Sequence, residues 1–313
     1  MSHYICKLHE SVTREHIRYY NRYGIALAGD IYMAKDMDKT KKHTAVVVGA
    51  PYGGVKEQGP CVYANELAQR GFVVLTFDPC YMGESGGEPR HVSSPELFSE
   101  NISAGVDYLG LLHYVDRDRI AALGICGSGG FALSAAAVDT RIKAVITVSM
   151  YDMSVASRLE LTPEQIRQRK EQLSLQRWKD AEKGLPEYIP SFPEEPVEEI
   201  PHDMQGIWRE FFDFYATKRG HHANALGGFT TTSDLSFLNY GLNDHIEEIS
   251  PRPILFIVGE QAESRFFSDM AFERAAEPKY RNVVPNCNHV DLYDDTAKIP
   301  FDDIVLFLQN SLQ

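Results

Sequence analysis

The 313-residue sequence lacks the features that mark several classes of protein. Basic residues are few, because 31 Lys and Arg stand against 44 Asp and Glu, and the net charge is −13. Nucleic-acid binding needs a basic surface, which this charge disfavours. No stretch approaches the roughly 18 apolar residues of a membrane-spanning helix. The N-terminal MSHYICKLHE also has no apolar run of signal-peptide length. We therefore expect a cytoplasmic protein that binds neither nucleic acid nor a membrane.

Cysteine is scarce, and its spacing disfavours a disulfide framework or a zinc cluster. The five residues are scattered, with no CxxC pair: Cys6, Cys61, Cys80, Cys126 and Cys287. The adjacent His221 and His222 are a poor metal pair, because neighbouring residues rarely chelate one ion and no third ligand is indicated. There is also no GxxxxGK[ST] phosphate loop. We therefore expect no metal and no cofactor.

What the sequence does contain is an alternation of apolar runs with amphipathic segments. Strong strands are predicted at 44–49, 72–77, 119–125, 142–149 and 253–259, with a short strand at 281–284. Helices are predicted at 62–70, from Ser94-Pro95 onward, at 129–138, 268–277 and 301–312. Nearly continuous apolar strands that alternate with helices indicate an α/β fold, a mostly parallel sheet with helices on both faces. The more polar segment 17–33 suits an antiparallel edge hairpin.

The regular alternation stops after Tyr151 and resumes near Pro253. Between them lie a charged helical segment, a Pro/Glu-rich stretch and an aromatic segment. We therefore predict a core built from residues 1–150 and 251–313 and a mainly helical cap insertion over 151–250. Ligands of such sheets collect at the carboxyl ends of the strands, so the insertion would roof the site. It also offers surface for a homodimer.

The candidate nucleophile lies in LGICGSGG, at the end of the third strong strand. A strand that feeds a helix through a sharp turn is the nucleophile-elbow geometry, and it needs small residues two positions before and after. Gly124 and Ser128 meet that need around Cys126. The helix N-terminus beyond it would favour a thiolate. Ser128, flanked by Cys126 and Gly130, is the alternative nucleophile, and an inert buried thiol in a Gly-rich turn is the structural alternative.

Together with four further motifs, this turn resembles the α/β-hydrolase superfamily. Within it, the chain is similar to the branch related to dienelactone hydrolases, Xaa-Pro-peptidase-like hydrolases and fungal polyketide thiohydrolases. The motifs are GGVKEQ (53–58), FDPCYMGESGGEPR (77–90), DTRIKAVITVS (139–149) and NHVDLYDD (288–295). The resemblance implies the α/β-hydrolase fold, and some members of the branch carry Ser where Cys126 stands.

The family order of nucleophile, acid and histidine implies that His289, the last histidine, is the base. The family usually places an Asp after the fifth strong strand, and this sequence has none at the expected spot. We favour Glu260 as the acid because it leaves the strand end closest to the sheet. Asp152, after the fourth strong strand, and Glu263 remain alternatives.

The oxyanion hole should combine two backbone N–H groups. One is expected from Gly127, which follows the nucleophile, and the other from Tyr52 or Gly53 in the loop after the first strong strand. Asp78 and Glu84 are interpreted as structural residues of their turn.

Aromatic side chains of the insertion are candidates for lining an acyl pocket, although packing within a helical core is the commoner role of such a stripe. They are Trp208, Phe211, Phe212, Phe214 and Tyr215, of which Trp208, Phe212 and Tyr215 are the favoured substrate-binding residues.

These patterns predict a hydrolase that cleaves an ester, thioester or lactone of a small acyl substrate through an acyl-cysteine intermediate. One alternative is an acyltransferase or carbon–carbon hydrolase of polyketide-like metabolism. Another is a catalytically silent binding module with the same fold.

Overall fold

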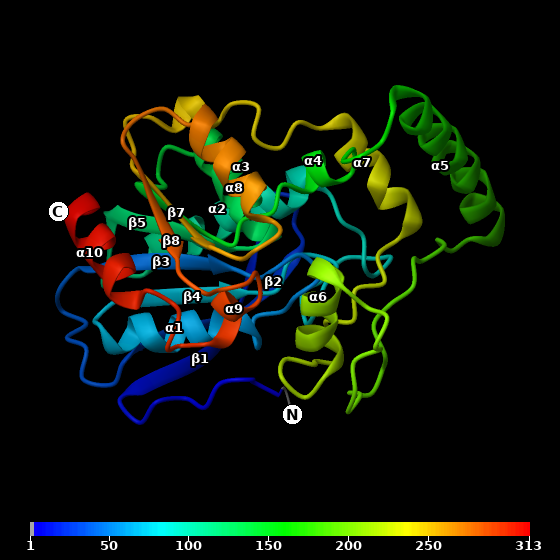
Figure 1. The fold of residues 1–313 in the computed structure, drawn as a ribbon. Helices are drawn as coiled ribbons and strands as arrows, with labels where there is room; N and C mark the ends of the chain where they lie inside the picture. The colour runs from blue at the N-terminus through cyan, green and yellow to red at the C-terminus, as the bar shows by residue number, and fades with distance from the viewer. Residues whose placement is uncertain (1–2) are drawn as a thin grey trace.

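The computed structural model describes residues 3–313, which form a sheet of eight strands with helices on both faces (Figure 1). The strands lie in the order β1-β2-β4-β3-β5-β6-β7-β8. Their bounds are β1 Val12–Tyr20, β2 Ala26–Ala34, β3 His43–Gly49, β4 Val73–Phe77, β5 Val115–Ile125, β6 Ala144–Val148, β7 Ile254–Gly259 and β8 Lys279–Val284. The strands from β4 to β8 are parallel, whereas β1 and β2 are antiparallel and form the edge hairpin. The predicted mostly parallel sheet is therefore confirmed.

The parallel strands are buried where they cross the core, as strands covered on both faces must be. Every residue of β4, β6 and β7 is buried. Strand β5 begins at Val115, four residues before the predicted start, because Val115 pairs with His43 ahead of an irregularity in the register. Because polar residues follow Val115, the apolar run in the sequence did not predict this extension of the strand.

One face of the sheet carries α1 (Gly59–Gln69), the short α9 (Asp291–Asp294) and α10 (Phe301–Ser311). The other face carries α2 (Pro95–Leu111), α3 (Gly127–Val138) and α8 (Arg265–Arg274), as Figure 1 shows. Helix α8 lies three residues earlier than predicted. It ends before Pro278, because the residue before a proline is disfavoured in a helix.

The segment between β6 and β7 is mainly helical. Its helices are α4 (Met153–Ala156), α5 (Pro163–Lys183), α6 (Gly206–Ala216) and α7 (Asp234–Asn239), with 3-10 turns at Thr231–Ser233 and Ile246–Ile249. Helix α5 is delimited by a capping box at Thr162 and by Gly184 in the left-handed conformation at its end. It projects from the body of the molecule (Figure 1). Within residues 3–313, no helix has both the length and the apolar character needed to cross a membrane.

Candidate functional site

The turn at Cys126 has the geometry of a nucleophile elbow. Cys126 adopts φ 54° and ψ −122° between the end of β5 and the start of α3, a conformation that non-glycine residues rarely adopt. A Cβ on Gly124 would lie 2.0 Å from the carbonyl oxygen of Ser128, so only glycine fits there. The strand and helix thus nearly touch, and strain at a single side chain of this kind is typical of functional sites.

Ser128 is turned away from the site. Its hydroxyl donates a hydrogen bond to the carbonyl oxygen of Ala50, and the side chain is buried. A Cβ on Gly49 would lie 2.8 Å from both side-chain atoms of Ser128, so the space around the hydroxyl is already filled. The geometry therefore presents Cys126, rather than Ser128, to a substrate.

Cys126 opens onto a cavity of about 640 Å³ between the core and the insertion. The three favoured pocket residues, Trp208, Phe212 and Tyr215, all line it. Other aromatic lining residues are Tyr52, Tyr151, Phe192, Phe211, Phe229, Phe237 and Tyr293. Phe214 instead packs edge-on against Tyr293, with ring centroids 5.1 Å apart. The aromatic stripe of α6 is thus divided between the cavity wall and the core.

Two backbone N–H groups lie near the Cys126 sulfur. The N–H groups of Gly127 and Tyr52 are close enough to lower the pKa of the thiol. Their loops are close, since a Cβ on Gly127 would lie 2.7 Å from the Cβ of Tyr52. Gly53 faces Phe229 instead, at a positive φ of 84°. Of the two residues that the sequence left open, the structure thus brings Tyr52 to the nucleophile.

Tyr52 is held in place by its side chain. Its ring stacks on Phe229, with centroids 4.2 Å apart, and its hydroxyl hydrogen-bonds to the hydroxyl of Ser93 at 2.6 Å. The backbone N–H at Tyr52 is therefore fixed before a substrate arrives, as an oxyanion-binding group should be.

His289 is completely buried. Its Nε2 lies 2.8 Å from the hydroxyl of Tyr293, and its Nδ1 hydrogen-bonds to the hydroxyl of Ser264. The Tyr293 side chain in turn lies close enough to the Cys126 thiol to lower its pKa. The predicted nucleophile and base are thus brought together, with the hydroxyl of Tyr293 between them.

The favoured acid, Glu260, does not reach the histidine ring. Its N–H still pairs with the carbonyl of Val284 on β8, and its exposed side chain accepts a bond from the N–H of Asn286 at 3.2 Å. The chain has therefore not yet left the sheet edge at Glu260, and its carboxylate turns to solvent. In this geometry Glu260 does not bond to His289, and its role as the residue that orients the ring stays a prediction.

Neither alternative acid bonds to the ring within the part of the chain that the structure describes. Asp152 caps α4, accepting bonds from the N–H groups of Ser154 and Val155, and also accepts one from the Asn243 side chain. Glu263 accepts a bond from the N–H of Ile207. The position beside Nδ1 is occupied by Ser264, a neutral residue at the start of α8.

A carboxylate does hold the histidine loop, but through its backbone. Glu210, on α6 of the insertion, accepts a bond from the N–H of His289 at 2.9 Å. Glu210, Ser264 and Tyr293 were all missed in the sequence. The one available signal was the spacing of Tyr293, four residues after His289, which places two side chains on one side of a helical turn.

Burial sets the protonation of both reacting groups. It raises the pKa of Cys126 to about 11, although the bonds from Tyr293, Gly127 and Tyr52 oppose this. It lowers the pKa of His289 to about 3. A neutral thiol therefore faces a neutral imidazole at pH 7. This corrects the expectation of a resting thiolate, because the loss of solvation outweighs the helix N-terminus.

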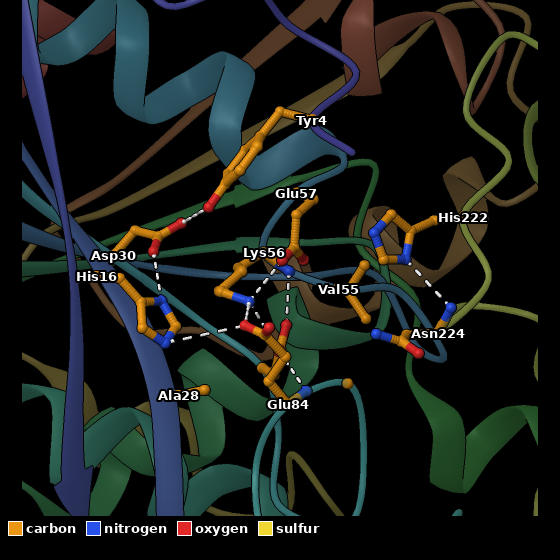
Figure 2. Close-up of polar contacts among 12 residues, drawn as sticks. Tyr4, His16, Ala28, Asp30, Val55, Lys56, Glu57, Glu84, His222 and Asn224 are labelled. Carbon is orange, nitrogen blue, oxygen red and sulfur yellow. Dashed lines mark hydrogen bonds and ion pairs between the residues drawn. The ribbon is translucent and has the colours of Figure 1, made fainter. Parts of the chain in front are cut away.

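The GGVKEQ motif places the buried Lys56 among carboxylates (Figure 2). The ammonium group of Lys56 lies 2.5 Å from Glu57, 3.1 Å from Asp78 and 2.6 Å from Glu84. The backbone N–H groups of Lys56 and Glu84 both donate to Asp78. Asp78 and Glu84 thus hold their turn, as interpreted from the sequence. The three carboxylates are close enough to hold a cation, but the Lys56 ammonium already lies among them and offsets part of their charge.

The paired histidines have separate partners. The ring of His221 bonds to the carbonyl of Pro193 at 3.2 Å, and His222 accepts a bond from the N–H of Asn224 (Figure 2). Each ring is therefore accounted for by local contacts.

Comparison with known proteins extends these observations, although no family model matches the chain. An uncharacterized protein of Pseudomonas aeruginosa is 47% identical over 97% of this chain and 82% of its own length. An uncharacterized protein of Escherichia coli is 35% identical over 88% of this chain and 90% of its own length. A thiohydrolase of Aspergillus aculeatus is 25% identical over 80% of this chain and 78% of its own length.

Solved structures agree with the fold. The crystal structure of a hypothetical protein from Pseudomonas aeruginosa matches with a TM-score of 0.94 at 46% identity, covering 99% of this chain and 97% of that one. An α/β-hydrolase from a Penicillium species matches with a TM-score of 0.80 at 21% identity, covering 96% and 99%. The predicted α/β-hydrolase fold is therefore confirmed. The chain thus has the α/β-hydrolase fold and belongs to the same family as the two uncharacterized proteins of Pseudomonas aeruginosa and Escherichia coli.

Proposed function

We propose that this chain hydrolyses an ester or thioester of an apolar acyl group through a covalent intermediate on Cys126. The observation that carries the proposal is the position of Cys126: it lies on a strained elbow, has two backbone N–H groups nearby and opens onto an apolar cavity. These are the features that acyl transfer to an enzyme nucleophile requires.

The proposed reaction steps follow from a Cys126 thiol and a His289 imidazole that are both neutral before the substrate binds. His289 takes the thiol proton as the sulfur attacks the carbonyl carbon, so a thiolate forms only during the reaction. The carbonyl oxygen becomes an oxyanion, which the N–H groups of Tyr52 and Gly127 are placed to receive. Collapse expels the alcohol or thiol and leaves an acyl-cysteine, and water then releases the acid.

The cavity supports an apolar acyl group as the substrate. Its wall is mostly aromatic, and Trp208, Phe212 and Tyr215 of α6 form part of it. Residues 151–250 would act as a cap that encloses this group. Thioesters suit a cysteine nucleophile because a thiol leaves readily, and lactones fit if the ring is small. The name of the Aspergillus aculeatus relative, a thiohydrolase, agrees with the thioester choice.

The proposal is tested with a panel of aryl esters and acyl thioesters, and with intact-protein mass spectrometry after rapid quenching. We expect turnover and a mass increase equal to one acyl group, located on Cys126. Cys126→Ala should lose both, and Cys6→Ala should keep both. Turnover that survives in Cys126→Ala would contradict the cysteine mechanism. The absence of turnover and acylation across the panel would favour a silent binding module.

Adding an acceptor alcohol or thiol to the same assay separates hydrolysis from acyl transfer. Hydrolysis predicts free acid as the main product at all acceptor concentrations. An acyl-acceptor product that dominates at low acceptor concentration would indicate a transferase instead.

A further inference from the structure

A row of polar side chains leads from the nucleophile to the far side of the base. The Tyr293 side chain lies close enough to the Cys126 thiol to lower its pKa, the Tyr293 hydroxyl lies 2.8 Å from His289 Nε2, and Nδ1 of His289 hydrogen-bonds to Ser264. All four side chains are buried. The tyrosine hydroxyl occupies His289 Nε2, and within residues 3–313 no direct hydrogen bond joins His289 to the Cys126 sulfur.

The direction of each bond depends on the charge states and on the tautomer of His289. His289 is neutral, because burial lowers its pKa, and Tyr293 keeps its proton, because burial raises its pKa well above the usual value. A neutral imidazole carries its proton on one of its two nitrogens. In the tautomer with the proton on Nδ1, the ring donates to Ser264 and the Tyr293 hydroxyl donates to Nε2, which leaves the Tyr293 oxygen as an acceptor for the Cys126 thiol proton.

Packing fixes the tyrosine in this position. Its ring meets Phe214 edge-on at 5.1 Å and lies 5.4 Å from the ring of His289. The hydroxyl of Tyr63 donates to the carbonyl of Leu292 at 2.6 Å, which anchors the turn that carries Tyr293. The tyrosine also lines the cavity, so it lies at the reacting atoms.

We propose that Tyr293 is a catalytic residue that relays the thiol proton from Cys126 to His289. This inference rests on the acyl-cysteine mechanism proposed above. As the sulfur attacks, the S–H proton moves to the Tyr293 oxygen while the tyrosine O–H proton moves to Nε2. The tyrosine ends neutral, the imidazole becomes an imidazolium, and the C–S bond forms. The reverse transfer returns one proton to the leaving group.

The relay also gives Ser264 a role. An imidazolium forms for only part of the reaction, and Ser264 keeps the ring in the orientation that points Nε2 at Tyr293. Ser264 is thus a positioning residue in the place where the sequence predicted a carboxylate. A neutral partner stabilises the imidazolium less than a carboxylate would, which agrees with a cysteine nucleophile, whose proton is easier to remove than that of serine.

The test compares Tyr293→Phe with the wild type on the best substrate of the panel. Phenylalanine keeps the ring and its packing but removes the hydroxyl. We expect kcat to fall by about 100-fold, the lower end of what general acid–base catalysis contributes, with KM changed less than about three-fold. Tyr19→Phe is the matched control. It removes the hydroxyl of a buried tyrosine on β1, away from the site, that has no hydrogen-bond partner among the described residues, and its kcat should stay within about two-fold of wild type.

A proton inventory supplies a readout that a structural role would not move. In mixtures of light and heavy water, two protons moving together predict a curved dependence of kcat on the deuterium fraction in the wild type. Tyr293→Phe should give a straight line, because at most one proton then moves. Thermal unfolding within a few degrees of wild type confirms that the variant is folded.

The outcomes separate the relay from the function on which it rests. If Cys126→Ala is inactive and Tyr293→Phe turns over at the wild-type rate or faster, the relay is wrong and the hydrolase proposal stands, with His289 meeting the thiol directly. If Cys126→Ala retains turnover, the proposed function itself has failed. An equal loss in Tyr19→Phe and Tyr293→Phe would also overturn the relay, because the loss would then not depend on the contact of the Tyr293 hydroxyl with His289.

Discussion

At the scale of the residue, burial decides the chemistry of Cys126 and His289. The N-terminus of a helix stabilises a thiolate. This gain is only a fraction of the free energy that it costs to remove the thiolate charge from water. Both groups therefore rest neutral, and the proton must move during the reaction. This distinguishes the site from cysteine enzymes that hold a thiolate–imidazolium pair before the substrate binds.

The reactivity of Cys126 toward iodoacetamide should reflect this resting thiol. With a pKa of about 11, its alkylation rate should keep rising from pH 7 to pH 10. Cys6 should react first at pH 7, since its side chain is partly exposed and its pKa is lowered by the bond to Cys61. Mass spectrometry of timed digests measures both rates. A plateau in the alkylation rate of Cys126 below pH 8 would contradict a neutral Cys126 thiol in the resting protein.

The buried His289 should also make the protein sensitive to acid. Its pKa is about 3 in the folded state against an ordinary 6.5. Between these two pH values the ring is therefore protonated in the unfolded chain and neutral in the folded protein. The stability from this group is present above pH 6.5 and is lost as the pH falls, by up to about 1.4 kcal/mol per pH unit.

Urea unfolding of wild type and His289→Gln at pH 7, 6 and 5 measures this effect. The difference in the free energy of unfolding should shrink as the pH falls, because only the wild type carries the titrating ring. A constant difference would show that His289 takes up a proton without unfolding.

At the scale of the element, the site depends on how three loops are joined. The loop after β3 carries Tyr52, and the buried Lys56 ties it to Asp78 at the end of β4 and to Glu84 in the next turn. A buried charge is tolerated only when it is paired. The ion pairs that Lys56 makes with Asp78 and Glu84 therefore hold the loop that carries Tyr52.

Lys56→Met should destabilise the protein by about 3–5 kcal/mol, because it leaves buried carboxylates without their partner. Denaturant unfolding followed by circular dichroism measures this. Lys41→Met is the control, since Lys41 is exposed and its ion pair with Asp38 spans 3.6 Å; it should change stability by less than about 0.5 kcal/mol. A loss below about 1 kcal/mol in Lys56→Met would indicate that the cluster is solvated.

At the scale of the whole molecule, the cavity exists only because the insertion is packed over the carboxyl ends of the strands. Cys126 and Tyr52 belong to the core, whereas Trp208 and Phe212 belong to α6. Glu210 and Arg219 of the insertion bind the loop of His289 and the side chain of Asp294. The segment between β6 and β7 and the loop of His289 are thus coupled.

Acyl chain length should control the specificity of this cavity. Each buried methylene contributes at most about 0.8 kcal/mol, so kcat/KM for aryl esters should rise up to roughly four-fold per methylene from acetyl to hexanoyl. Phe212→Ala should shift the optimum to longer chains. Leu111→Ala, an exposed site on α2, should leave the profile unchanged. A flat profile in the wild type would show that the acyl group binds elsewhere.

The sequence by itself determined the sheet, the elbow and the pocket residues. Their signals are local: apolar runs give buried strands, small residues around Cys126 permit the turn, and aromatic residues cluster in one segment. The partners of His289 were decided only by tertiary structure. Ser264 and Tyr293 approach the ring from separate elements, and Glu260 is turned outward because its backbone still pairs with β8. The pKa values of Cys126 and His289 depended on tertiary structure as well, because burial is a property of the packed chain and not of the residues that carry the charge.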